Sequence, residues 1–208
     1  MKHTGRVAST ASEGGSARQQ ELLEAAYAWV LERGWAGMSL RPLAEAIGSS
    51  PRVLLFLFGS KDGLVRALLA RSRADQLAVL DGLRDGPGDD PADGPAGLAV
   101  VGERVWAWLA APEHRALLRL WLEAYTRSVA DPGDGPWAGF AARTVEDWDA
   151  LLAHHQPPAR RDTPAGVAER ALLLAVLRGA LLDLLATGDA ARLDAAVAAH
   201  LAAHLAAR

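Results

Sequence analysis

Five side chains that can donate hydrogen bonds to phosphate or to a base edge lie close together in the sequence: Ser39, Arg41, Ser50, Arg52 and Lys61. Arginine pairs bidentately with guanine in the major groove, so Arg52, near the start of a predicted helix, is the candidate for direct reading of a base. Lys61 lies in the first turn of another predicted helix, where a cation beside free backbone N–H groups favours an anion such as a DNA phosphate. The alternative for Lys61 is a solvated surface lysine. The chemistry that this segment offers is nucleic-acid binding.

Two short helices joined by a tight turn are predicted to position these side chains. Apolar residues recur at helical spacing from Leu40 to Ile47, and Ser39 precedes them as a predicted cap. Gly48 is predicted to end this helix, because glycine takes a left-handed backbone without a steric penalty. Ser50-Pro51 then suits the N-cap and the first position of a second helix. The pattern is a helix-turn-helix, whose second helix would enter the major groove of DNA.

An ordered series of residues between about residues 20 and 71 resembles the tetracycline-repressor (TetR) family of transcriptional regulators. The series comprises Leu22-Leu23, Ala25-Ala26, Gly34-Trp35, Ser39-Leu40, Leu43-Ala44, Gly48, Ser50, Leu54, Phe58, Ser60-Lys61 and Leu64. The resemblance implies an all-α homodimer with a DNA-binding head and a ligand-binding body. It also implies that a small apolar effector enters the body, that the helix beginning at Ser60 tilts, and that the two recognition helices then lose the spacing of their operator half-sites.

The predicted recognition helix departs from that family's pattern at Leu55 and Leu57, where the family usually has tyrosine or histidine. A leucine side chain cannot hydrogen-bond a phosphate. Residues 53–58 are six consecutive apolar residues, so the alternative is that this helix simply belongs to the core. The predicted DNA-binding set is Ser39, Arg41, Ser50, Arg52, Val53, Leu55, Phe56 and Lys61.

Composition agrees with a chain that has a DNA-binding head. Residues 1–71 hold nine Lys and Arg against six Asp and Glu, whereas the remainder holds thirteen against nineteen. A basic head on an acidic body suits a protein whose head alone meets phosphate. Half of the 208 residues are hydrophobic and none is cysteine, which allows a sizeable core without disulfides. Neither a signal peptide nor an apolar run long enough for a membrane helix is visible, so we expect a cytoplasmic protein without a membrane partner.

The predicted fold is all-α, with about nine helices. Residues 1–17 are predicted to be a disordered N-terminal arm, 18–60 the helix-turn-helix domain, and 61–208 the ligand-binding and dimerisation domain. The arm is polar and small, so it is either a floppy tail or a basic arm that follows the minor groove. The first helix is expected to begin at Arg18, and loops are expected at residues 85–97, 131–136 and 156–164 because these are rich in Pro, Gly and Asp.

Aromatic side chains of the body are predicted to line an apolar pocket for an effector. The predicted ligand-binding residues are Trp106, Trp121, Tyr125, Trp137, Phe140 and Trp148, with Asp183 to fix a polar group of the ligand. Ordinary core packing is the alternative for each aromatic residue. Glu123 also interrupts an apolar face, where it either meets a ligand or is paired within the fold.

The last two helices are predicted to form a two-fold dimer. Residues 166–186 are apolar nearly all round, and a helix of that kind must be buried. The final helix carries a stripe of leucine and valine among alanines. The predicted interface is Leu174, Leu181, Leu193, Val197 and Leu201, arranged as a four-helix bundle with the same patch on both partners.

No catalytic, cofactor or metal site is predicted. His200 and His204 lie four residues apart on a helix, but two histidines without a third ligand are a weak metal signal. The predicted function is a ligand-responsive repressor of a pseudo-palindromic double-stranded DNA operator, released by a small apolar or aromatic effector. The alternatives are a regulator whose head no longer binds DNA and acts through protein contacts, or an all-α enzyme acting on an apolar substrate.

Overall fold

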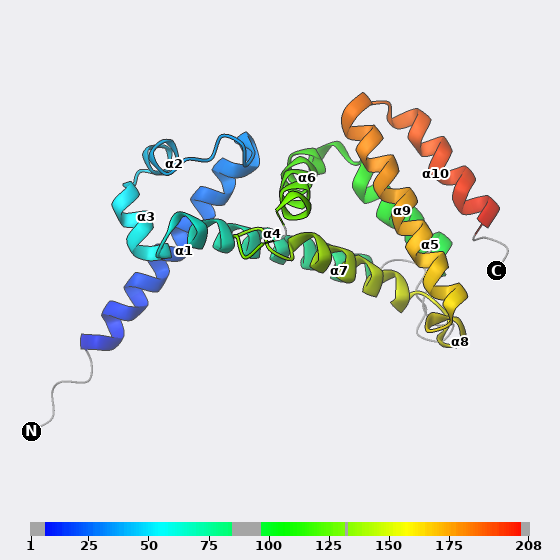
Figure 1. Cartoon of the computed structure of the whole chain (residues 1–208), viewed down its shortest axis with the longest axis horizontal. Coiled ribbons are helices and arrows are strands. Elements are labelled where there is room, and N and C mark those ends of the chain that lie inside the picture. The colour runs from blue at the N-terminus through cyan, green and yellow to red at the C-terminus, as the bar shows by residue number, and fades with distance from the viewer. Residues whose placement is uncertain (1–6, 85–96, 132, 205–208) are drawn as a thin grey trace, which may run out of the picture. The chain divides into compact units, whose positions relative to one another are not determined.

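The computed structural model describes residues 7–84, 97–131 and 133–204, and every regular element in these ranges is a helix (Figure 1). The predicted all-α fold is confirmed. In chain order the helices are α1 Val7–Arg33, α2 Leu40–Ala46, α3 Pro51–Phe58, α4 Lys61–Arg84, α5 Leu98–Ala110, the 3-10 helix η1 Pro112–His114, α6 Arg115–Ala130, α7 Phe140–His154, α8 Pro158–Arg161, α9 Pro164–Thr187 and α10 Ala190–His204. Among the described helices, none combines the length and the apolar character needed to span a membrane.

Two helix boundaries differ from the sequence prediction. α8 lies inside the predicted loop 156–164, because Pro158 supplies the backbone angle of a first helical turn. α1 begins at Val7 rather than at Arg18. No proline lies between residues 7 and 18, so nothing in this segment blocks the helix. Each residue added to an existing helix gains a backbone hydrogen bond, which favours the longer α1. Residues 1–6 of the predicted arm lie outside the described residues.

The chain divides into two compact units. Unit 1 comprises Met1–Arg73 with Leu120–Ala138, and unit 2 comprises Ala74–Arg119 with Gly139–Arg208. The division falls within α4 and within α6. The unit that contains the helix-turn-helix therefore also contains most of α6.

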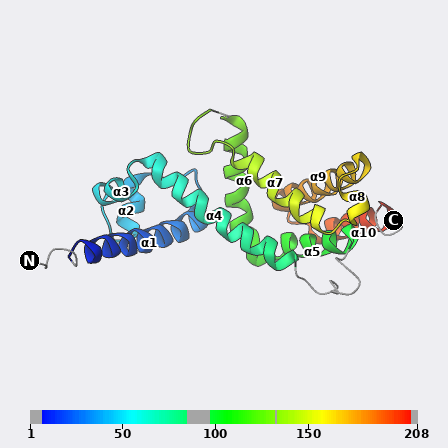
Figure 2. The ribbon, with the colours of Figure 1, turned by 90° about the horizontal axis from the view of Figure 1, so that it is seen from below.

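Unit 1 is built around the helix-turn-helix. α2 packs against both α1 and α3, and these three helices lie together in both ribbon views (Figure 2). Their facing side chains, with those of the first turns of α4, form a fully buried apolar core: Leu22, Ala26, Val30, Leu43, Leu54, Leu64 and Leu68. This core holds α3 in place on one side only.

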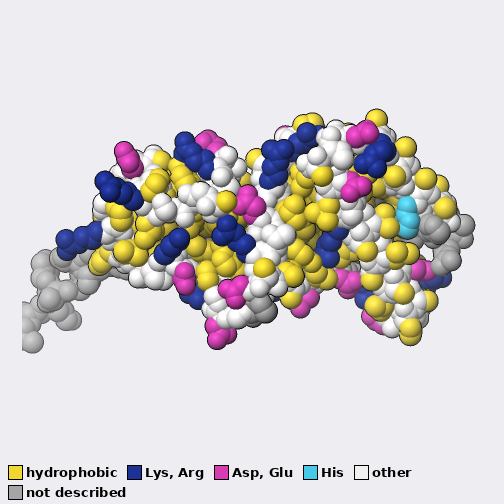
Figure 3. All heavy atoms as spheres, turned by 45° about the horizontal axis from the view of Figure 1, so that its top comes forward, with side chains coloured by type: hydrophobic (Ala, Val, Ile, Leu, Met, Phe, Trp, Pro, Cys, Tyr) yellow, Lys and Arg dark blue, Asp and Glu magenta, His cyan; other side chains and the backbone are white. Residues whose placement is uncertain are grey.

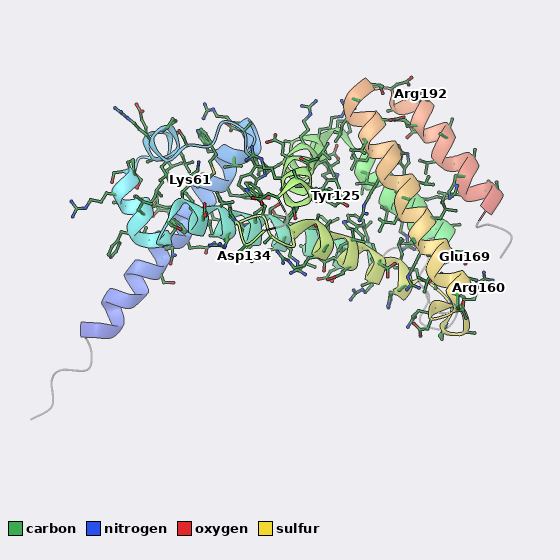
Figure 4. All side chains as sticks on the ribbon, viewed as in Figure 1. Lys61, Tyr125, Asp134, Arg160, Glu169 and Arg192 are labelled. Carbon is green, nitrogen blue, oxygen red and sulfur yellow. The ribbon has the colours of Figure 1, made fainter. Side chains whose placement is uncertain are left out.

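Unit 2 is built around α9, which packs against α5, α7, α8 and α10. α5 and α10 approach so closely that a Cβ added at Gly102 would lie 2.8 Å from Leu201 Cδ2. The Arg170 side chain joins α7 to α9, because its Nε donates to Asp149 Oδ1 at 2.8 Å and its Nη1 donates to Gln156 Oε1 at 3.0 Å. A second ion pair, Arg160 with Glu169, fastens α8 to the start of α9 (Figure 4).

Candidate nucleic-acid interface

The turn between α2 and α3 has the geometry that the sequence predicts. Gly48 has φ +63°, and its N–H donates to Glu45 O at 3.3 Å while Ser49 N–H donates to Ala44 O at 2.8 Å. This pair of bonds is a Schellman motif, which ends α2. Ser50 Oγ then accepts from Val53 N–H at 3.3 Å and caps α3.

Ser39 does not behave as predicted. It precedes α2 with an extended backbone, but its side chain makes no cap hydrogen bond. Ser39 is exposed and does not cap the helix end. Arg41, two residues further on, is also exposed on α2.

α3 turns one face to the core and the rest to the solvent. Leu54 is fully buried, whereas Arg52, Val53, Leu55 and Phe56 are exposed. The alternative that this helix is merely part of the core is therefore wrong. Among the described residues of α3, Leu54 is the one that is buried, and the face that would meet DNA is mostly apolar. Figure 3 shows the same mixture, with Lys and Arg side chains standing among hydrophobic ones over this part of the chain.

The junction of α3 and α4 fixes Lys61 beside the recognition helix. Gly59 takes φ +77°, a left-handed conformation that lets the chain turn between the two helices. Ser60 Oγ accepts from Gly63 N–H at 2.9 Å and caps α4. Lys61 is exposed in the first turn (Figure 4). Gln19 of α1 ties down the other side of the junction, because its Nε2 donates to Leu57 O at 2.8 Å.

Glu123 of α6 binds the connection between α1 and α2. One oxygen of its carboxylate accepts from Trp35 N–H at 2.8 Å and from Ala36 N–H at 3.2 Å. Trp35 is itself buried, and its indole N–H donates to Leu120 O at 3.0 Å. Gly34, with φ +74°, makes room for the carboxylate, since a Cβ there would lie 2.5 Å from Glu123 Oε1. Of the two fates weighed for Glu123, the structure shows pairing within the fold.

The predicted ligand-binding residues are divided between the two units. Trp121, Tyr125 and Trp137 belong to unit 1, whereas Trp106, Phe140, Trp148 and Asp183 belong to unit 2. In unit 1, the Trp121 and Tyr125 rings lie 5.1 Å apart, and Trp137 packs edge-on against Trp35 at 5.0 Å.

Their counterparts in unit 2 are mostly core. Phe140 and Trp148 are buried. Asp183 is exposed and pairs with Arg192 at 3.7 Å, so it does not enter an apolar pocket of this unit.

Trp106 does line a groove, which lies between α5 and α10. The groove has a volume of about 420 Å³, and its walls are Glu103, Trp106, Ala107, Ala110, Ala111, Asp194, Val197, Ala198 and Leu201. Trp106 Nε1 donates to Asp194 Oδ1 at 2.8 Å. No sequence pattern indicates this pair, because its two members are far apart in the chain and lie on different helices.

The residues predicted to form the dimer interface are core residues of a single chain. Leu174, Leu181, Leu193, Val197 and Leu201 are all buried within unit 2 without any partner. This stripe is covered within the chain, because α5, α9 and α10 pack on one another. The exposed faces of α9 and α10 are different, and they consist mainly of alanine with Gly179, Leu172 and Leu182.

The chain is similar to known proteins both in sequence and in structure. Residues 22–68 match the model of the family described as bacterial regulatory proteins, tetR family. No match is found among curated proteins.

Several solved structures are similar over most of the chain. A protein from Rhodococcus sp. assigned to the TetR family of transcriptional regulators has a TM-score of 0.64 at 21% identity, covering 89% of this chain and 99% of its own. The multidrug binding protein EbrR complexed with ethidium has a TM-score of 0.61 at 26% identity, covering 88% and 98%. A TetR-family member from Streptomyces coelicolor A3 has a TM-score of 0.57 at 25% identity, covering 88% and 97%.

Proposed function

We propose that this chain, whose residues 22–68 match the model of the tetR family of bacterial regulatory proteins, is a ligand-responsive repressor which binds a pseudo-palindromic operator as a homodimer. The observation that carries the proposal is the outward face of α3, where Arg52 is exposed next to apolar side chains on a helix held by a well-formed turn. Two such helices, related by a two-fold axis, would enter major grooves one helical turn apart.

Each polar residue of the interface has a separate part in the proposal. Arg52 reads a guanine, because an exposed arginine near the start of a recognition helix can donate both of its terminal N–H groups to one base edge. Lys61 binds a phosphate beside the N-terminus of α4, where the helix dipole adds to its charge. The exposed Ser39 and Arg41, with Ser50, follow the backbone and set the register of the head on the duplex.

The dimer is proposed to form through the exposed faces of α9 and α10. On α9, exposed residues follow a seam with alternating spacings of four and three: Ala168, Leu172, Ala175, Gly179, Leu182 and Ala186. That spacing is the one that left-handed helix packing uses, and small side chains let helix axes come close. On α10 the exposed residues are mainly alanines, so two helices from each partner would make a four-helix bundle.

The effector is proposed to be a small apolar or aromatic molecule. Support comes from the tryptophans and tyrosine of the body and from EbrR, a similar protein that binds ethidium and proflavin. Flat aromatic molecules stack well on indole and phenol rings.

Binding to DNA fragments of the protein's own genome tests the proposal directly. We expect enrichment of a few fragments that contain an inverted repeat, and retention of one such fragment in a gel-shift assay. Arg52→Ala should weaken binding to that fragment by roughly 1–3 kcal/mol and relax preference at one base pair. Lys61→Ala should weaken binding to all sequences alike and reduce the slope of log K against log salt by about one.

Arg119→Ala is the matched control, because Arg119 is an exposed arginine of unit 2. It should leave both affinity and salt slope unchanged. Capture of no fragment above bulk genomic DNA would favour the alternative of a regulator that works through protein contacts.

A further inference from the structure

The outward face of α3 carries an apolar patch that no part of unit 1 covers. Phe56 is 85% exposed, the largest value for any large hydrophobic side chain in the part of the chain that the structure describes. Val53 and Leu55 flank it at 38% and 40%. A phenyl ring left in water forgoes the stabilisation that burial would bring, so a ring this exposed points to a partner.

The patch cannot be turned inward by a small adjustment of the helix. Leu54 and Phe56 are two residues apart, which places them on nearly opposite sides of an α-helix. Leu54 is fully buried, so burying Phe56 would expose Leu54. The Ser50 cap and the bond from Gln19 to Leu57 O hold this orientation from both ends of the helix.

The charged neighbours of the patch indicate what kind of partner it fits. Arg52 is exposed and lies four residues before Phe56, so both side chains project from the same face of α3. Lys61, also exposed, follows at the start of α4. An apolar ring beside two cations suits the DNA major groove, where phosphates line the edges and the 5-methyl group of thymine is the apolar feature of the floor.

We propose that Phe56, assisted by Val53, reads thymine 5-methyl groups, and that the apolar side chains of α3 thereby replace the polar contacts that Leu55 and Leu57 cannot make. This inference rests on the proposed function and deepens it. Four residues advance an α-helix by about 6 Å, close to two base-pair steps of about 3.4 Å. The thymine read by Phe56 therefore lies about two base pairs from the guanine read by Arg52.

Replacing single thymines by deoxyuridine tests the proposal, because deoxyuridine lacks only the 5-methyl group and keeps every hydrogen-bonding group. The full-length protein is titrated into labelled operator duplexes, each with one thymine replaced, and affinity is followed by fluorescence anisotropy. We expect one or two positions per half-site to lose about fourfold in affinity, the effect of withdrawing one methyl group from apolar contact. Replacements elsewhere in the operator should have no effect.

Variants of Phe56 assign the effect to its side chain. Phe56→Ser should bind the thymine and deoxyuridine duplexes equally at the sensitive position, whereas Phe56→Leu, which stays apolar, should keep part of the preference. Arg52→Ala should keep the thymine preference in full while losing preference at the guanine. Because Phe56 is exposed, its variants should melt at the same temperature as the wild type.

The outcomes separate this inference from the proposed function. If the wild type binds its operator but no thymine position distinguishes deoxyuridine, or if Phe56→Ser keeps the distinction, the reading of methyl groups is refuted and the repressor function stands. If the wild type binds no operator at all, the proposed function fails and the patch belongs to a protein partner instead.

Discussion

Replacing Glu123 by alanine should destabilise the DNA-binding unit although Glu123 lies far along the chain from the helix-turn-helix. Its carboxylate accepts from Trp35 N–H at 2.8 Å and from Ala36 N–H at 3.2 Å. A hydrogen bond to a charged acceptor contributes about 1.5–3 kcal/mol when the donor would otherwise be buried. Ala36 is exposed, so water can satisfy its N–H once the carboxylate is gone.

The expected loss is therefore that of one good bond, about 2 kcal/mol. For a chain of 208 residues this corresponds to a fall in melting temperature of about 4–8 °C. Glu123→Gln should lose less, because its amide oxygen still accepts a hydrogen bond without the charge. Glu146→Ala is the control, since Glu146 is an exposed carboxylate on α7 of unit 2.

A substitution at Gly34 provides a second test of the Glu123 prediction, because the side chain of an alanine there would contact the Glu123 carboxylate. Its φ of +74° costs any other residue about 1–2 kcal/mol, and its Cβ would lie 2.5 Å from Glu123 Oε1. Gly34→Ala should therefore cost both the backbone strain and the displaced hydrogen bond. In the Glu123→Ala background the carboxylate is already absent, so only the strain should remain.

Gly48→Ala gives the matched comparison. Gly48 has φ +63°, but a Cβ there would meet nothing within 4 Å. Urea denaturation of the single and double variants measures the coupling free energy of each glycine substitution with Glu123→Ala. We expect about 1–2 kcal/mol of coupling between Gly34→Ala and Glu123→Ala, and additivity for Gly48→Ala with Glu123→Ala. Additivity of the Gly34 pair within about 0.5 kcal/mol would refute the reasoning.

Three further predictions concern the rest of the chain. Val197→Glu should lower the melting temperature of the protomer, because Val197 is buried in unit 2, whereas Ala199→Glu on the exposed face of α10 should yield stable monomers by light scattering. A fully stable monomer from Val197→Glu would contradict this assignment. Arg170→Met should cost about 1–3 kcal/mol in urea denaturation, because it leaves the amide oxygen of the buried Gln156 without its donor. Ser50→Ala should cost about 1 kcal/mol, and Ser39→Ala close to none, because of these two serines Ser50 alone makes a cap bond; equal losses would contradict the cap geometry.

The helix-turn-helix could be predicted from the sequence because its rules are local. Gly48 ends α2 through its left-handed backbone conformation. Ser50 caps α3, and Pro51 suits the first position of that helix because it has no N–H. Each of these signals is contained within a few residues. The outward side of α3 could not be predicted in the same way, because a run of six apolar residues has no polar positions to mark which face of the helix is exposed.

The hydrogen bonds of Glu123 and Trp106 could not be predicted, because each joins residues more than eighty positions apart. A carboxylate on an apolar face indicates that some partner exists, but it does not indicate whether that partner is a ligand or a backbone. The same limit applies to the aromatic residues: the sequence shows which rings are available, but the unit in which each ring packs depends on tertiary contacts.

The residues predicted for the dimer interface show that an apolar stripe indicates burial without indicating what buries it. On α10 the leucine and valine stripe is the strongest apolar face, and a chain that folds before it associates uses its strongest face internally. Leu193, Val197 and Leu201 accordingly lie in the core of unit 2. What remains for a partner is the weaker face, made of alanines. We therefore expect the proposed dimer to be held together by the small exposed residues beside the leucine and valine stripe.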